Sequence, residues 1–435
     1  MNRPQRLTLR PGPASALFFA LCLGAALFLS DTAYAARARD ERLGPAQYAA
    51  VTEARALLDK GDPAGAVKRL LPVADDARPP LPVLDHLAWA QERAGDHGAA
   101  LATYRKAAAL YPDDPGTLRN LGILLFNQRH FADAARTLER AYGLQPEGAR
   151  EPALLAMAGS AQARLNHFVK ALRLLDRAGH TGGKVPVAWS AMAVYCCQRL
   201  ERPDDALARS RACAQSHPAS PAAWTLLGRV LARHGDPLAA ASALETAKAL
   251  RPGLGASGES EELAALYALG HAHAEAARCL AADDGPDTTL RRAGLLWLAG
   301  DNRAALDALD RFDREAAASD TAVKERLRAA LLRGRILRDM GKQGAAVDGL
   351  LAAAKVIRPP AADRTGQRLR GALLLLAGEL RWAQRDWTGA ARIFDALAEA
   401  PGYGETGASL AAGMRAMARE AALAPAPLRE LPADR

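Results

Sequence analysis

Apolar residues recur along this chain at the spacing of one helical face, and they do so in pairs of segments. In one such pair, the residues on one face of the first segment are Leu118, Leu121, Gly122 and Leu125. After a polar turn, the corresponding residues of the second segment are Ala134, Leu138 and Ala141. Pro146 ends the second segment, because proline lacks an amide donor and clashes with the preceding helical turn. The pattern predicts a helix–turn–helix hairpin.

The predicted hairpin recurs at an interval of 34 residues. Pairs of residues at this interval are Ala100 and Ala134, Pro112 and Pro146, Ala206 and Ala240, and Pro218 and Pro252. An alanine and a proline both recur at this interval, each in two parts of the chain, and such agreement would rarely arise by chance. A single hairpin cannot bury its own apolar face, so the repetition predicts a stack of hairpins in which each one covers its neighbour.

This repeat resembles the tetratricopeptide repeat, whose unit has large residues and a glycine in its first helix, an alanine early in its second helix and a closing proline. One unit carries the pattern on Trp224, Leu227, Gly228, Ala240, Ala247 and Pro252. A second carries it on Leu121, Gly122, Ala134, Ala141 and Pro146. In a third, alanine replaces the glycine: Leu84, Leu87, Ala88, Ala100, Tyr104, Ala107 and Pro112. Weaker units are marked by Ala66, Ala171, Ala206, Ala276, Ala305, Ala346 and Ala390.

The resemblance implies an all-α fold, a tetratricopeptide α-solenoid that forms a right-handed superhelix of about ten helix–turn–helix units. We expect the array to occupy residues 45–401, a capping helix residues 402–424 and a tail residues 425–435. Composition agrees with this class, because alanine is abundant and aromatic residues are only 5% of the chain. Small residues with high helix propensity suit close helix packing better than they suit β-sheets.

The first 35 residues have the pattern of a signal peptide. Arg3, Arg6 and Arg10 precede an uncharged apolar stretch from Ala14 to Leu29, and a small–x–small cleavage pattern follows at 33–35. As a helix the stretch would rise about 24 Å, which is less than the roughly 30 Å of a hydrocarbon core. We therefore expect residues 1–35 to be cleaved, residues 36–44 to be a linker and the mature protein to be periplasmic or otherwise exported. The alternative is an inner-membrane anchor formed by an uncleaved N-terminal segment.

The formal net charge of +9 becomes about +7 without residues 1–35, which carry three arginines and one aspartate. This excess favours acidic partners, but it is too diffuse to predict nucleic-acid binding. The remaining cysteines are Cys196, Cys197, Cys213 and Cys279. Their spacing fits neither a redox pair nor a haem or zinc site. We interpret them as small buried residues, with a disulfide between Cys197 and Cys213 as the alternative in an oxidising compartment.

Three short patterns resemble catalytic or ligand-binding motifs, and each lacks the required context. Residues 253–258 spell GxGxxG but follow the end of a helical hairpin rather than a strand. Residues 182–184 resemble part of a phosphate-binding loop but lack its first glycine and its hydroxyl residue. His271, His273 and Cys279 are too few for a convincing metal site. The sequence thus predicts a protein that is not an enzyme and needs no metal or cofactor.

In the tetratricopeptide family, the inner wall of the superhelix is built mostly from the first helix of each unit. That geometry assigns the following residues to a partner-binding groove: Trp89, Arg93, Arg119, Asn120, Phe126, Asn127, Tyr195, Arg199, Arg229 and Arg233. Arg335 and Arg338 continue the series. Arginine pairs bidentately with carboxylates and stacks on aromatic rings, so the groove suits an extended acidic or C-terminal peptide. The alternative is that these arginines only solvate exposed helix faces.

These features together predict a non-catalytic protein–protein interaction scaffold or adaptor in the bacterial cell envelope. Its expected partners are other envelope proteins or peptides, with no nucleic acid and no stable membrane span after signal cleavage. The alternative function is an accessory subunit of an envelope polysaccharide-export or cell-wall remodelling complex. A carbohydrate groove would favour stacked aromatic residues with acids and amides, whereas this wall is rich in arginine.

Overall fold

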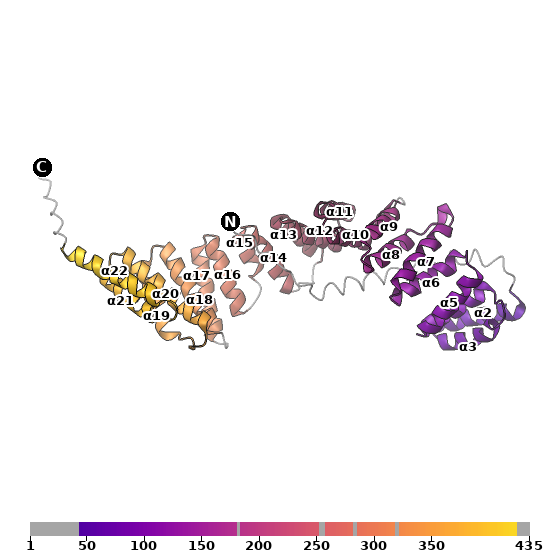
Figure 1. The fold of residues 1–435 in the computed structure, drawn as a ribbon, viewed down its shortest axis with the longest axis horizontal. Helices are drawn as coiled ribbons and strands as arrows, with labels where there is room; N and C mark the ends of the chain where they lie inside the picture. The colour runs from indigo at the N-terminus through magenta and orange to yellow at the C-terminus, as the bar shows by residue number, and fades with distance from the viewer. Residues whose placement is uncertain (1–42, 181–182, 252–256, 282–284, 318–321, 424–435) are drawn as a thin grey trace. The chain divides into compact units, whose positions relative to one another are not determined.

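The computed structural model describes residues 43–180, 183–251, 257–281, 285–317 and 322–423. Within these residues the chain forms α-helices and one short 3₁₀ helix, with no strand (Figure 1). The all-α expectation is confirmed. The predicted signal peptide, most of the linker, the tail and most of the GxGxxG segment lie outside the described residues. None of the described helices is long and apolar enough to cross a membrane.

In the part of the chain that the structure describes, the helices follow one another as ten hairpins and one additional helix. The first five hairpins are α2 (Pro45–Asp59) with α3 (Pro63–Ala74), α4 (Leu81–Arg93) with α5 (His97–Leu110), α6 (Pro115–Asn127) with α7 (Phe131–Leu144), α8 (Pro152–Arg164) with α9 (Phe168–Gly179), and α10 (Val187–Arg199) with α11 (Pro203–Ser216). The next five are α12 (Pro221–His234) with α13 (Pro237–Ala249), α14 (Ser257–Leu269) with α15 (His273–Cys279), α16 (Pro286–Leu298) with α17 (Asn302–Ala317), α18 (Val323–Asp339) with α19 (Gln343–Val356), and α20 (Arg364–Ala383) with α21 (Trp387–Ala398). The additional helix is α22 (Gly404–Leu423), and the 3₁₀ helix η3 (Glu147–Ala149) precedes α8.

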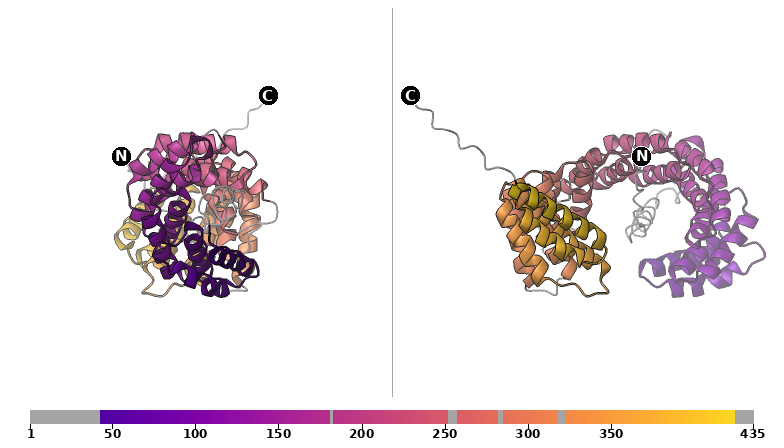
Figure 2. Two further views of the ribbon diagram at one scale, coloured as in Figure 1. Left: turned by 90° about the vertical axis from the view of Figure 1, so that its right-hand side faces the viewer. Right: turned by 60° about the vertical axis from the view of Figure 1, so that its left-hand side comes forward.

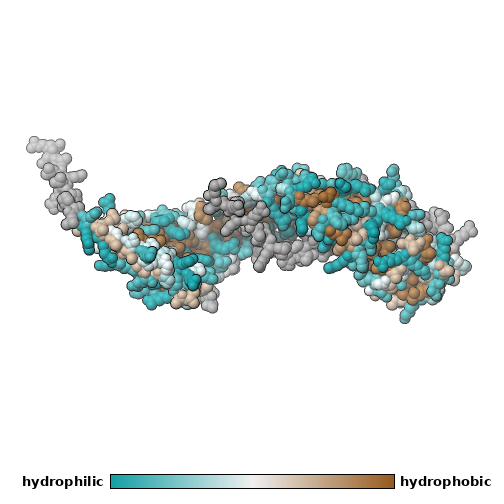
Figure 3. Space-filling model, viewed as in Figure 1, coloured by the Kyte–Doolittle hydropathy of each residue, from teal (hydrophilic) through white to brown (hydrophobic). Residues whose placement is uncertain are grey.

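The chain divides into two compact units, residues 1–230 and residues 231–435, with the division inside α12. In the first unit, each helix from α2 to α11 packs mainly on the helices that precede and follow it along the chain. The second unit is built in the same way from α13 to α22. Figure 2 shows this side-by-side stacking of hairpins within each unit. On the face drawn in Figure 3, hydrophilic side chains cover much of the surface and apolar ones gather in patches among them.

The turn inside every hairpin has the same backbone geometry. One residue adopts a left-handed conformation, with φ between 56° and 92°. In chain order these residues are Gly61, Gly95, Arg129, Asn166, Glu201, Gly235, His271, Gly300, Gly341 and Arg385. The amide of the residue that follows donates to the carbonyl five positions earlier, for example from Asp96 to Gln91 at 2.9 Å. This bond satisfies a carbonyl at the end of the first helix and closes a Schellman motif.

A buried alanine lies five residues beyond each left-handed residue. The ten alanines are Ala66, Ala100, Ala134, Ala171, Ala206, Ala240, Ala276, Ala305, Ala346 and Ala390, and none is more than 1% exposed. Each alanine amide closes the first hydrogen-bonded turn of the second helix. A larger side chain at this position would meet the packed first helix, so the alanine is required by the close approach of the two helices. These are the alanines that mark the repeat in the sequence.

A second pair of positions sets how the two helices of a hairpin fit together. The residue seven before the left-handed residue is small in nine hairpins: Ala54, Ala88, Gly122, Gly159, Gly228, Ala264, Ala293, Gly334 and Gly378. The residue nine after it is large in the same hairpins: Leu70, Tyr104, Leu138, Leu175, Leu244, Leu280, Leu309, Leu350 and Phe394. The two positions are in contact, since a Cβ at Gly122 would lie 2.7 Å from the Leu138 side chain.

Hairpin five reverses this arrangement of sizes. Val194 occupies the small position on α10, and Ser210 occupies the large position on α11. Val194 is 2% exposed and Ser210 is completely buried, where its hydroxyl donates to the Leu207 carbonyl at 2.9 Å. The larger residue has therefore moved from the second helix to the first while both positions stay in the core. Total volume across the interface is roughly kept, which cores tolerate best.

Polar side chains also join successive hairpins of the first unit. The Thr117 hydroxyl on α6 donates to the Asp85 carboxylate on α4 at 3.1 Å, and both residues are buried. On the second helices, Arg209 forms a two-pronged contact with Asp176, at 2.7 and 3.1 Å. Both pairs join equivalent helices of neighbouring hairpins, first helix to first helix or second to second. They add directional contacts to the apolar stacking and so help to fix how one hairpin sits on the next.

Candidate protein-binding surface

In the first unit, the first helices of the hairpins carry a series of exposed aromatic and basic side chains. On α4, Trp89 is 38% exposed and Arg93 lies one helical turn further on, also exposed. On α10, Tyr195 is 37% exposed and Arg199 follows at the same spacing. In each hairpin, these two positions lie six and two residues before the left-handed residue. The same turn geometry therefore presents an aromatic ring and a guanidinium together on both helices.

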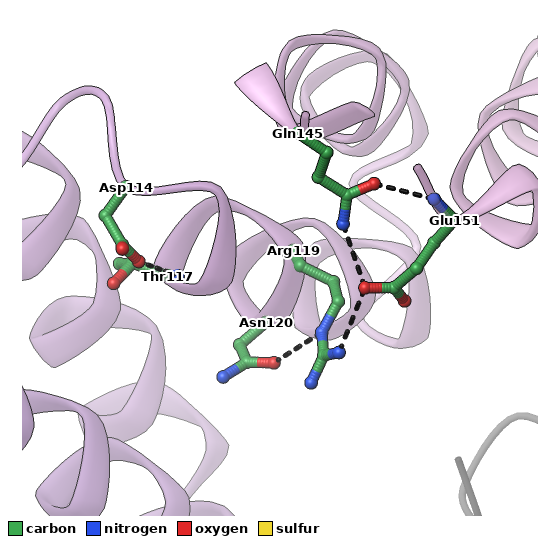
Figure 4. Close-up of polar contacts among 6 residues, drawn as sticks. All are labelled: Asp114, Thr117, Arg119, Asn120, Gln145 and Glu151. Atoms are coloured by element: carbon green, nitrogen blue, oxygen red, sulfur yellow. Dashed lines mark hydrogen bonds and ion pairs between the residues drawn. The ribbon is translucent and has the colours of Figure 1, made fainter. Parts of the chain in front are cut away.

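Arg119, which the sequence places in the groove, is committed to an internal contact. Its Nη1 donates to Glu151 Oε1 at 3.3 Å, and its Nε donates to Asn120 Oδ1 at 3.3 Å (Figure 4). Gln145 holds the same glutamate from the other side. Its Nε2 donates to Glu151 Oε1 at 2.8 Å, and it accepts the Glu151 amide at 2.7 Å. The Arg119 side chain is only 19% exposed. It joins hairpins three and four and offers a partner less charge than its residue type suggests.

Asn120 is also engaged inside the unit. It hydrogen-bonds the hydroxyl of Tyr104, a residue whose burial raises its pKa above the ordinary value for tyrosine. Asn127, in contrast, is exposed on α6. The two asparagines of the predicted groove therefore differ. Asn120 contributes to the packing of α5 on α6, whereas Asn127 is accessible to a partner.

Two arginine–phenylalanine contacts repeat from one hairpin to the next. The Arg164 guanidinium lies 6.0 Å from the centre of the Phe131 ring, and that of Arg199 lies 5.2 Å from the centre of the Phe168 ring. Each phenylalanine follows the left-handed residue of its own hairpin by two positions, and each arginine comes from the next hairpin. Stacking of this kind orients the guanidinium plane.

Further aromatic contacts tie the predicted groove residues to these stacks. Phe126 meets Phe131 edge to face, with the ring centres 5.5 Å apart. Tyr195 meets Phe168 in the same way at 6.0 Å. The sequence-based site missed Phe131, Arg164 and Phe168. A signal for the phenylalanines was present, because an aromatic residue stands directly after a histidine at both turns.

The remaining predicted residues lie on α12 and α18. Arg229 and Arg233 are exposed, one helical turn apart on α12. Arg335 is exposed on α18, whereas Arg338 pairs with Asp339 at 2.9 Å. Asp339 also accepts the Trp297 indole N–H at 2.8 Å, and hydrogen bonds from Trp297 and Arg338 help to keep its pKa below the ordinary value for aspartate. Arg338 is thus partly neutralised.

In the second unit, first helices expose a different chemistry. An open pocket of about 350 Å³ is lined by α14, α16 and α18. Its lining residues are Ala264, Ala265, Ala268, Arg291, Gly294, Leu295, Trp297, Leu298 and Leu332. The one charged residue in this set, Arg291, pairs with Glu261 at 3.4 Å. This mainly apolar pocket therefore differs in chemistry from the aromatic and basic side chains on the first helices of the first unit.

The described cysteines and histidines form no recognisable ligand site. Cys196, Cys197 and Cys213 are buried and unpaired, and Cys279 is partly buried and unpaired. The His271 and His273 rings meet edge to face with their centres 5.9 Å apart. Among the residues that the structure describes, no three or more histidine, cysteine, aspartate or glutamate side chains are grouped as metal ligands would be.

Comparison with known proteins agrees with the geometry of the hairpins. Residues 81–124 and 198–254 each match a family model described as tetratricopeptide repeat. With ten turns of one conformation, these matches define a helical-repeat protein. The chain contains tetratricopeptide repeats in these two segments. Such repeats generally form non-catalytic scaffolds that bind proteins or peptides, and this chain is a protein–protein interaction scaffold.

Several solved structures are similar in fold. MamA is 18% identical over 38% of this chain and 94% of its own, with a TM-score of 0.35. YrrB, described as a TPR protein with an unusual peptide-binding site, is 20% identical over 40% of this chain and 87% of its own, with a TM-score of 0.34. A tetratricopeptide repeat protein from Parabacteroides merdae ATCC 43184 is 15% identical over 60% of this chain and 98% of its own, with a TM-score of 0.35. A search of curated proteins finds no match.

Proposed function

We propose that this scaffold works in the bacterial cell envelope and binds extended or acidic peptide segments of other envelope proteins. The observation that carries the proposal is the repeated stacking of Arg164 on Phe131 and of Arg199 on Phe168. A guanidinium held by an aromatic ring loses less side-chain entropy when it binds, and its fork fits a carboxylate. Arg164 and Arg199 lie on α8 and α10, the first helices of successive hairpins.

An extended peptide can meet both groups at once. An extended segment advances about 3.3 Å per residue, so acidic residues a few positions apart can reach groups on successive hairpins. Trp89 and Tyr195 are exposed on the same helix positions and offer apolar contact to the peptide between its charges. Arg93, Asn127, Arg229 and Arg233 extend the proposed surface along the first helices.

The test is an in-cell crosslink and pull-down of the tagged protein. The variant Arg93→Glu/Arg199→Glu reverses two exposed charges on α4 and α10. A matched control, Arg105→Glu/Arg211→Glu, reverses two exposed charges on the second helices α5 and α11. We expect wild type and the control to capture the same discrete envelope protein and the first variant to lose it. Equal capture by all three proteins, with equal helicity and melting, would contradict the proposed surface.

The proposed location of the protein in the cell envelope rests on its N-terminal sequence. It can be tested separately from the binding surface. Mass spectrometry of the native protein should find a mature chain that begins at Ala36, released with the periplasmic fraction. A chain that retains residues 1–35 and sediments with the inner membrane would establish the anchored alternative. A full-length chain in the cytosol would refute export altogether.

A further inference from the structure

The second helices border a depression next to the first-helix surface of the proposed function. It is an open hollow of about 600 Å³, formed by α7, α9 and the turns next to them. Phe168, Val169, Leu174 and Leu200 give it an apolar floor, and Val169 is 53% exposed. A volume of this size lies within the range of about 300–1,000 Å³ that is typical of ligand sites.

Basic side chains surround the apolar floor. Lys170, Arg173 and Arg177 line the hollow together with one acidic residue, Glu139. Lys170 and Glu139 form an ion pair at 3.0 Å, so their charges offset each other. The two arginines are exposed and lie one turn apart on α9. The net charge of the hollow therefore comes from Arg173 and Arg177.

Neither arginine has an acidic partner among the described residues. Arg173 makes no ion pair or hydrogen bond with them, and Arg177 lies 5.9 Å from the centre of the Tyr142 ring. On the preceding second helix, α7, the arginines behave differently. Arg136 pairs with Asp133 and Arg140 pairs with Asp113. Like charges one turn apart destabilise a helix, so α9 keeps an unfavourable pair that α7 neutralises with acids.

We propose that this hollow is a second docking surface, and that its occupant is a short acidic segment of a partner protein with one bulky apolar side chain. The apolar side chain lies on Phe168 and Val169, and two carboxylates pair with Arg173 and Arg177. Residues one helical turn apart have their Cβ atoms about 5–6 Å apart, and alternate residues of an extended segment are separated by about 7 Å. An acid–x–acid segment therefore matches the two arginines. Phe168 borders both this surface and the first-helix surface of the proposed function, because Arg199 stacks on its ring. Val169, Arg173 and Arg177 belong to the hollow alone.

The test measures binding of a synthetic peptide to the full chain by fluorescence anisotropy. The probe is a fluorescein-labelled peptide of alternating glutamate and leucine. Two control peptides replace glutamate with lysine or leucine with serine. We expect the glutamate–leucine peptide to bind and both control peptides to bind at least about tenfold more weakly, a difference that anisotropy resolves readily.

Variants then locate the bound peptide. Arg173→Glu and Val169→Asp should each weaken binding about tenfold, whereas Arg105→Glu, an equal charge change on α5, should leave it unchanged. Circular dichroism establishes that all variants keep wild-type helicity. Loss of binding in Arg93→Glu/Arg199→Glu but not in Arg173→Glu would overturn this inference and support the first-helix surface instead. The inference would also fail if the peptide did not bind, or if the serine peptide bound equally well.

Discussion

A valine and a serine in hairpin five show how single residues set the fit between two helices. In the other nine hairpins a small residue on the first helix faces a large one on the second. Val194 and Ser210 have the sizes reversed, and both are buried. The pair should therefore be coupled energetically, because each residue is the right size only for the other.

A double-mutant cycle tests this coupling. Ser210→Leu alone should overpack the interface against Val194 and cost about 1–3 kcal/mol. Val194→Gly alone should leave a cavity and lower helix propensity, at a cost of about 2–4 kcal/mol. The double variant restores the arrangement of the other hairpins, so its loss of stability in urea denaturation should be much smaller than the sum. Additive losses would show that the two positions do not share one interface.

The left-handed turn residues lead to a second prediction at this scale. A non-glycine residue in this conformation costs about 1–2 kcal/mol, which glycine avoids. Arg129→Gly should therefore raise the free energy of unfolding by up to about 1 kcal/mol after the greater flexibility of unfolded glycine is subtracted. Asn166→Gly should gain less, because asparagine tolerates this region better than arginine.

The reciprocal substitution provides the control for the turn residues. Gly95 has φ +83°, and the space that a Cβ would occupy there is open, so Gly95→Ala tests the backbone alone. We expect it to lower the melting temperature of the protein. A rise in stability for Gly95→Ala, or a loss for Arg129→Gly, would show that conformation at these turns does not limit stability.

At the scale of the elements, the hairpins were largely predictable and the contacts between them were not. All ten alanines that mark the repeat in the sequence are the buried residues at the start of the second helices. This worked because alanine spacing depends only on local geometry within one hairpin. The pairing of Arg119 with Glu151 depends instead on how hairpin three meets hairpin four. The same holds for Arg164 on Phe131, which no periodicity within one helix could reveal.

The packing of α10 on α11 makes a prediction about the thiols. These helices bury Cys196, Cys197 and Cys213, and burial raises the pKa of Cys196 to about 12. Few thiolates are then present near pH 8, and access is blocked as well. A thiol-reactive dye should label Cys279 first in the native protein and the three buried thiols only after denaturation. Denatured, unreduced protein that shows two thiols fewer would instead reveal a disulfide between Cys197 and Cys213.

At the scale of the whole molecule, each helix contacts mainly its neighbours along the chain, so a local defect should remain local. Gly122→Trp places a large side chain where even a Cβ lies 2.7 Å from Leu138, and it should cost about 1–3 kcal/mol or more. Hydrogen exchange measured by mass spectrometry should then increase in α6, α7 and α8 and stay unchanged in α2 and in the second unit.

A substitution in the same hairpin serves as the control for this experiment. Gly143 lies on α7 with open space where a Cβ would lie, so Gly143→Ala should leave exchange unchanged or slow it slightly. A uniform increase of exchange throughout both units in the Gly122→Trp protein would mean that the chain unfolds as one cooperative body.

The distance between successive left-handed residues varies from 29 to 44 residues, whereas the alanine always follows by five. The number of residues from the left-handed residue to the alanine is therefore constant. The number of residues in the rest of the repeat varies from one hairpin to the next. For protein engineering, this marks where the chain accepts new sequence. An epitope tag or a fluorophore attachment site inserted in the connection between two hairpins would be tolerated, while one inserted between a left-handed residue and its alanine would disrupt the hairpin. Whole hairpins could be exchanged as cassettes with cuts made in those same connections.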